Sequence, residues 1–162
     1  METDTNIFST IAIGFTIFTL GQIFLKMVIE PVQNLKTTIS EIAFTLANYY
    51  LIFHNVDVVD KEHADSAFDT TREFSYKLHA EVSLIPFYTY SRHIFRLPSK
   101  EKIEKASEEL LYISNTIFST DDLKCERIDK NSKNVFDFLN INISLNKMIN
   151  REKLHEQSRE QQ

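Results

Sequence analysis

Residues 5–25 read TNIFSTIAIGFTIFTLGQIFL and contain no charged side chain. As an α-helix this stretch is about 32 Å long, enough to cross a hydrocarbon core of about 30 Å. Its Ser, Thr, Asn and Gln side chains are tolerated in lipid when they bond to their own helix or to a neighbour. Lys26 can extend its ammonium group to the interface. We therefore predict a transmembrane segment in residues 1–30, with the span at about 5–29.

Two other interpretations of this stretch are weaker. A secretory signal peptide begins with basic residues and ends in a small-residue cleavage site, whereas Glu2 and Asp4 precede the run here and no A-x-A pattern follows it. A helix buried in the core of a soluble protein would more often carry a charge within such a length. The transmembrane interpretation is the one we carry forward.

Basic residues predict the orientation. All 18 Lys and Arg residues lie at or beyond Lys26, and the short N-terminal flank carries the acids Glu2 and Asp4. By the positive-inside rule the N-terminus faces outwards and the remainder of the chain faces the cytoplasm. The single-pass topology makes the lipid bilayer the first expected partner, and it places the single cysteine, Cys125, in a reducing compartment. Cys125 is then expected to act as a small apolar core residue.

Glycine is rare, because the 162 residues include only Gly14 and Gly21 where an average protein of this length has roughly eleven. Sandwiches, barrels, Rossmann units and phosphate-cradling loops depend on glycine in their turns, so the composition argues against all of them. Turns that need a positive φ are likewise not expected. The prediction is an all-α protein, with an N-terminal transmembrane helix followed by a cytoplasmic bundle of three to four helices in residues 31–146.

Apolar residues locate the helices of this bundle. Pro31 disfavours helical conformation at Glu30, so we expect a kink or break at the membrane surface. An apolar seam at alternating spacings of three and four follows: Val32, Leu35, Ile39, Ile42, Leu46, Tyr49 and Phe53. A second cytoplasmic helix is expected over about 60–83 and a third after the N-cap Ser99. A fourth begins at Asp121 or Asp122 and runs towards Leu139, and the charged residues 147–162 are expected to be a flexible tail.

One patch of the sequence combines aromatic and basic side chains. Residues 87–105 carry a net charge of +3, from five Lys or Arg residues against Glu101 and Glu104. Such a patch, followed by a helix N-terminus, suits a phosphate or a stacked base. The candidate ligand-binding residues are Tyr88, Tyr90, Arg92, His93, Arg96 and Lys100. In the alternative, which we favour, Phe87, Ile94, Phe95 and Leu97 plug the bundle, while the two arginines pair with the acidic residues 57–73 or face anionic lipid headgroups.

Small residues in the span form a second candidate surface. Thr10, Gly14 and Gly21 share one helix face, and small residues let helices approach closely in lipid. They are the candidate residues for oligomerisation, together with the apolar seam that continues below them. The competing interpretation is that the seam faces the other cytoplasmic helices of its own chain.

The sequence contains no positive evidence for an enzyme. The HExxH motif, the G-x-S-x-G motif and nucleotide-binding glycine motifs are all absent, and one cysteine cannot build a zinc knuckle. We therefore expect no catalytic residue, no metal site and no cofactor, and we see no evidence for binding of DNA or RNA.

Two stretches, GQIFLKMVIEPVQNLKTTISEIA (21–43) and RHIFRLPSKEKIEKASEELLYISNTIF (92–118), resemble a group of small, uncharacterised bacterial membrane proteins. That group has one N-terminal transmembrane helix and a cytoplasmic helical domain. The resemblance implies a bacterial inner-membrane protein and transfers no catalytic residue. We expect a non-enzymatic protein whose helical domain binds a protein partner and self-associates as a homo-oligomer. The alternative is a ligand-gated membrane effector that senses a nucleotide or another anionic signal, as in bacterial defence systems.

Overall fold

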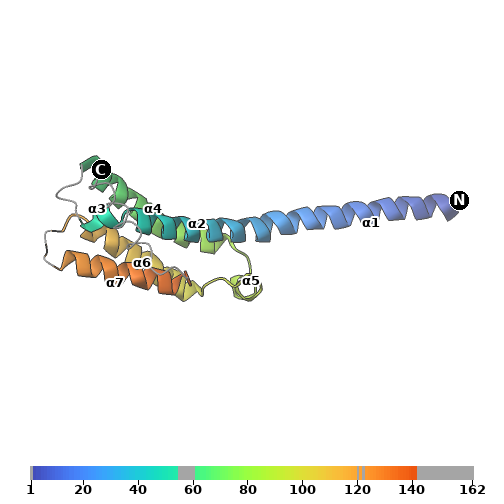
Figure 1. Cartoon of the computed structure of the whole chain (residues 1–162). Coiled ribbons are helices and arrows are strands. Elements are labelled where there is room, and N and C mark those ends of the chain that lie inside the picture. Colours follow the sequence, from blue (N-terminus) through green and yellow to red (C-terminus); the bar gives the residue numbers. More distant parts are fainter. Residues whose placement is uncertain (1, 55–60, 120, 122, 142–162) are drawn as a thin grey trace, which may run out of the picture.

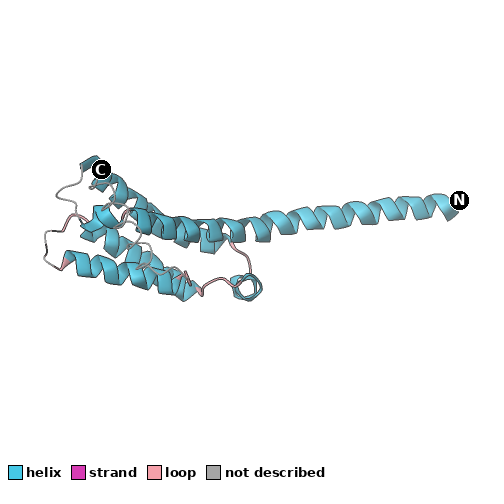
Figure 2. Ribbon diagram, viewed as in Figure 1, coloured by secondary structure: helices cyan, strands magenta, loops and turns pink. Residues whose placement is uncertain are grey.

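The computed structural model describes residues 2–54, 61–119, 121 and 123–141, and in these residues every regular element is helical (Figure 2). The elements in chain order are α1 (Glu2–Phe24), the π-helical turn η1 (Leu25–Ile29), α2 (Glu30–Asn48), α3 (Tyr50–His54), α4 (Lys61–Leu84), α5 (Tyr88–Phe95), α6 (Lys100–Thr116) and α7 (Lys124–Phe138). The all-α prediction is confirmed. The predicted tail, 147–162, and the predicted end of the bundle at 146 lie outside the described residues.

The elements α1, η1 and α2 form one long rod, of which the C-terminal part joins the bundle and the N-terminal part projects away from it (Figure 1). The stretch Ile7–Asn48 contains one apolar segment near the N-terminus that is long enough to cross a membrane, by length and composition. None of the side chains in that segment is buried by the rest of the structure.

The expected break at Pro31 does not occur. Pro31 lies in the first turn of α2, directly after η1, where the N–H of Glu30 bonds to the carbonyl of Leu25, five residues back. In an uninterrupted α-helix the proline ring clashes with the carbonyl four residues back. A π turn shifts the hydrogen-bond ladder by one residue, which makes room for the ring and lets the helix continue.

The bundle is built around α4 and α6. The rod contributes α2, which packs on α4; α4 packs on α6 and α6 on α7, while the short α3 contacts α4 and α7 (Figure 1). The seam of α2 and α3 enters this core. Val32, Leu35, Ile42, Leu46 and Phe53 are buried, and Ile39 and Tyr49 pack against them. The seam therefore faces the helices of its own chain, as the competing interpretation had it.

The predicted start of the third cytoplasmic helix is confirmed by a capping contact. The hydroxyl of Ser99 accepts the N–H of Lys102 at 3.3 Å, which caps α6. The helix expected to begin at Asp121 or Asp122 begins at Lys124, and its N-cap, Leu123, makes no side-chain cap bond; Asp121 accepts the N–H of Leu123 at 3.1 Å in the turn before it. The helix predicted at 60–83 occurs as Lys61–Leu84.

The helix α5 and the turns that flank it are not predicted by the sequence pattern. Phe87, Arg96 and Asn140 have φ values of 49°, 55° and 56°, so the expectation that this chain avoids positive-φ turns is wrong. The left-handed conformation costs a residue other than glycine about 1–2 kcal/mol. Two of these residues, Phe87 and Arg96, cap the two ends of α5.

The core position Leu110 offers a test of the bundle. Its side chain is buried in α6, which lies between α4 and α7, so Leu110→Ala should leave a cavity and lower the free energy of unfolding by about 2–5 kcal/mol. Tyr112, on the same helix, is exposed, and Tyr112→Ala should change it by less than about 0.5 kcal/mol. Urea unfolding of the detergent-solubilised full chain measures both. Equal losses in the two variants would contradict this arrangement of the core.

Candidate functional site

The aromatic–basic patch lies at the end of the bundle from which the rod emerges (Figure 1). It follows the C-terminal end of α4, where Glu81 and Leu84 line a cavity of about 40 Å³ together with Pro31 and Asn34 of α2. The end of α4 is thus level with the start of α2, directly after η1. The patch is therefore next to the apolar part of the rod.

Local hydrogen bonds hold α5 against its own flanks. The hydroxyl of Tyr88 donates to the carbonyl of Pro98 at 2.8 Å, and the buried Ser91 donates its hydroxyl proton to the carbonyl of Pro86 at 3.1 Å. At the C-terminal end, the N–H of Leu97 bonds to the carbonyl of Arg92 at 3.0 Å. These bonds tie the helix to both prolines that bracket it.

The two tyrosines of the predicted ligand site have different surroundings. Tyr88 is half-buried, and burial raises the pKa of its hydroxyl to about 12, an effect that the nearby Arg92 guanidinium partly offsets. Tyr90 is exposed to solvent. Tyr88 is thus an anchor of α5, and Tyr90 is the tyrosine available for contact with another molecule.

The basic side chains of the patch point away from the core. His93, Arg96 and Lys100 are exposed and Arg92 is half-buried. In the part of the chain that the structure describes, none of these four takes part in a salt bridge. The proposed pairing of the arginines with the acidic residues 57–73 is not seen for residues 61–73, the part of that stretch that is described. Glu73 is eleven residues, about 16 Å of helix, before the end of α4.

The plug hypothesis is confirmed for two residues and wrong for two. Leu97 is buried and Phe95 packs against the core. Phe87 and Ile94 are instead among the most exposed apolar side chains of the bundle. The reason is the left-handed conformation at Phe87, which sets the direction in which α5 starts and leaves this face of the helix outside.

A shallow groove of about 460 Å³ between α4 and α6 was not anticipated. It is lined by Ser75, Tyr76, His79, Ala80, Glu104, Ser107, Glu108 and Leu111. The buried hydroxyl of Ser75 donates to the carbonyl of Ser107 at 2.8 Å and holds the two helices close at its floor. The sequence feature that could have indicated this groove is the presence of small residues on the apolar faces of both helices. Among the described residues no group of three or more His, Cys, Asp or Glu side chains is placed to hold a metal ion.

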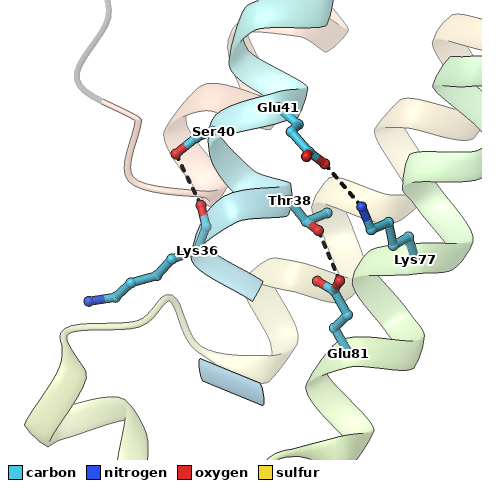
Figure 3. A network of polar contacts seen from close by, with 6 residues as sticks. All are labelled: Lys36, Thr38, Ser40, Glu41, Lys77 and Glu81. Atoms are coloured by element: carbon cyan, nitrogen blue, oxygen red, sulfur yellow. Dashed lines mark hydrogen bonds and ion pairs between the residues drawn. The ribbon is translucent and has the colours of Figure 1, made fainter. Parts of the chain in front are cut away.

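The interface of α2 and α4 contains a polar network (Figure 3). Thr38 donates a hydrogen bond of 2.9 Å to Oε1 of Glu81, and Lys77 forms an ion pair of 3.0 Å with Glu41. Ser40 bonds back to the carbonyl of Lys36 on α2. The network joins the rod to the bundle on the side where the rod leaves it.

Glu81 is the member of this network whose hydrogen-bonding capacity is only partly satisfied. Its Oε2 is shielded from solvent and has no hydrogen-bond partner among the described residues. Burial raises the pKa of the carboxyl, while the hydrogen bond from Thr38 and the charge of Lys77 lower it and Glu41 raises it. The net direction is upward, so the fold favours the neutral form of Glu81.

The candidate oligomerisation residues lie on the free part of the rod. Gly14 and Gly21 are exposed in α1, and a Cβ added to either would meet no atom within 4 Å. Thr10 is on the same helix and is also exposed. Nearby, Thr16 and Thr19 donate their hydroxyl protons to carbonyls four residues back, at 2.8 Å each, as expected for polar side chains in lipid. In the part of the chain that the structure describes, no atom lies within 4 Å of a Cβ added at Gly14 or Gly21.

Cys125 is exposed on α7, so its expected role as a small core residue is wrong. The face of α7 that packs on α6 is formed by other residues: Ile128, Ser132, Val135 and Phe136 are buried. The apolar character of the thiol carried no information about which side of the helix it occupies.

Glu81→Gln should stabilise the protein at neutral pH. The folded state binds the proton of Glu81 more tightly than the unfolded chain does, so stability is lost as the pH rises through the raised pKa. Because the residue is only half-buried, the gain from Gln is expected to stay below about 1 kcal/mol. Melting curves of the full chain should show this gain in stability at pH 7 and a smaller gain as the pH falls towards 4.5. Glu73→Gln, on the exposed side of α4, is the matched control, and an equal gain there would contradict the assignment.

Comparison with known proteins does not place the chain in a family: no family model, no curated protein and no solved structure matches it.

Proposed function

We propose that the protein is a single-pass protein of the bacterial inner membrane, with its N-terminus outside and its helical bundle in the cytoplasm, and that the bundle acts without catalysis as an interaction domain. The observation that carries this proposal is the apolar surface of α1. From Ile7 to Phe24 its large apolar side chains are 49–75% exposed and no other element covers them. A helix that is apolar all round is stable when it is buried, and lipid is the medium that buries it here.

The continuity of the rod supports a retained span. The helix runs through η1 into α2, whose seam forms part of the bundle core. Removal of the apolar segment as a signal peptide would expose the start of α2 next to the buried Val32. A helix of the soluble core, the other alternative, would have buried side chains, which this segment lacks.

Charge supports the proposed orientation. Lys26 lies in η1, at the end of the apolar segment, and Lys36 follows on the bundle side, whereas Glu2 and Asp4 are at the other end. The positive-inside rule counts the basic residues close to the span and puts the bundle on the cytoplasmic side. The resemblance to small bacterial membrane proteins with this layout supports the same topology.

Self-association through the span is part of the proposal. Each glycine in a helix costs about 1 kcal/mol relative to alanine, and nothing in the chain's own packing requires Gly14 or Gly21. Close approach of a second α1 along Thr10, Gly14 and Gly21 would supply the reason. Since the seam of α2 is buried within the chain, the span is the remaining candidate surface for a homo-oligomer.

Crosslinking of the full chain in native membranes tests the oligomer. The expected result is a crosslinked dimer or higher oligomer that is weakened by Gly14→Leu and Gly21→Leu, because the larger side chains keep the helices apart. Ala12→Leu places the same leucine on the opposite face of α1 and should leave crosslinking unchanged. A monomer in all three variants and in the wild type would remove this part of the proposal.

The second candidate function is a ligand-gated membrane effector. The cations Arg92, Arg96 and Lys100, which form no salt bridge with the described residues, favour it. Arg92, Arg96 and Lys100 would bind phosphate and Tyr90 would stack on a base, with Tyr88 as the anchor of α5. Binding beside the start of the span could then shift the rod. The layout is shared with small nucleotide-sensing effectors of bacterial defence systems, which is an analogy of architecture alone.

Thermal unfolding of the detergent-solubilised full chain tests the effector candidate with ATP, GTP and a cyclic dinucleotide as probes. A ligand at about 100 times its Kd stabilises the folded state by about 2.7 kcal/mol, which raises Tm by several degrees. The rise should disappear in Arg96→Gln combined with Lys100→Gln. Lys133→Gln, an exposed cation on α7, should retain it. If no probe raises Tm, the effector candidate is discarded.

A further inference from the structure

The outer face of α5 is formed by Tyr90 and Ile94, and the exposed Leu84, at the end of α4, and Phe87, the N-cap of α5, precede it. The side chains of Leu84, Phe87, Tyr90 and Ile94 are 66%, 80%, 74% and 73% exposed. Tyr90 and Ile94 are four residues apart, so they share one side of α5, while Ser91 and Phe95 face inwards. A cytoplasmic helix with a bare apolar side of this kind is an interaction surface.

The place of α5 in the fold limits what can cover this face. Figure 1 shows α5 at the end of the bundle from which the rod emerges, apart from the rod itself, and looks down the axis of α5 while α1 runs across the picture. The two helices are thus crosswise to each other. A helix that lies flat on a membrane has this relation to one that crosses it.

The charges around the outer face fit anionic lipid. Residues 84–100 contain Arg92, Arg96 and Lys100 and no Asp or Glu, which gives +3 with the histidine neutral, in a chain whose net charge is −5. Lys26 and Lys36 lie on the neighbouring part of the rod. Basic residues at this level are attracted to anionic headgroups. Of the acidic residues of α4, Glu81 lies near this end and is half-buried, while Glu62, Asp65, Asp69 and Glu73 lie further towards the other end.

The backbone at Phe87 is a second, independent observation. Phe87 adopts the left-handed conformation at the start of α5, with a side chain that no part of its own chain covers. Strain of this kind persists where the surrounding structure imposes it and gathers at functional positions. Here its effect is to present an aromatic ring outwards.

We propose that α5 is a membrane-surface helix. Its outer face enters the boundary between headgroups and acyl chains of the cytoplasmic leaflet, next to the span, while the exposed Arg96 and Lys100 contact anionic headgroups. The bundle is thereby held at the bilayer by two contacts, the span and α5, and α5 fixes its tilt. The proposal rests on the proposed membrane location and adds the anionic lipid surface as the partner of the patch.

Fluorescence quenching by lipid tests the proposal on the full chain. The chain is reconstituted in vesicles of equimolar brominated phosphatidylcholine and phosphatidylglycerol, in a Cys125→Ser background, with one environment-sensitive probe on an introduced cysteine. Tyr90→Cys reports the outer face of α5, Phe15→Cys the span, and Tyr112→Cys an exposed tyrosine site on α6. We expect quenching at positions 15 and 90 and none at 112.

Charge variants test the lipid specificity. Replacing phosphatidylglycerol by phosphatidylcholine, or combining Arg96→Gln with Lys100→Gln, should lower the ratio of docked to undocked α5 about 30-fold. Lys133→Gln, on α7, should have no effect. Circular dichroism of each variant verifies that the bundle remains helical, which is expected because the replaced side chains are exposed.

The outcomes separate this proposal from the membrane location itself. An absence of quenching at position 15 would overturn the span and with it the proposal. Quenching at 15 without quenching at 90 would overturn the docking of α5 alone. Quenching at 90 that is lost when the protein is diluted in lipid, or when ATP is added, would assign the face to a second copy or to a nucleotide, and would overturn the lipid assignment.

Discussion

Burial of one helix face, the apolar side of α2, sets the arrangement of the rest of the molecule. Leu35 and Ile42 are in the core, so α2 cannot rotate or slide without exposing them. Because α1 continues α2 through η1, the same packing also fixes the direction in which the apolar segment leaves the bundle. The free energy that aligns this segment thus comes from hydrophobic contacts made more than a turn away, within the bundle.

The π turn lets the helix continue through Pro31, so the packing of α2 also fixes the direction of α1. A break there would have let the span and the bundle move independently. By shifting the ladder to a bond between Glu30 and Leu25, the chain retains one helix and accepts the proline. Further along α2, the hydrogen bond between Thr38 and Glu81 also joins the rod to α4.

The end of the bundle beside the rod combines several features that elsewhere in the protein are separate. It has the exposed apolar side chains of α5, the exposed cations Arg96 and Lys100 and the half-buried Glu81. The opposite end, with the start of α4, is acidic. The two ends of the bundle therefore differ in chemistry, which agrees with the proposed topology.

The sequence by itself determined the helices other than α5, the apolar segment and the Ser99 cap, because each depends on periodicity or on contacts within one turn. It also located the cations of the patch. Only the tertiary structure decided which side chains face out: Tyr88 is an anchor and Tyr90 is free, Phe87 and Ile94 are outside, and Cys125 is exposed. The physical reason is that the direction of α5 depends on two left-handed turns without glycine, at Phe87 and Arg96, whose cost is offset by contacts between residues distant in the chain.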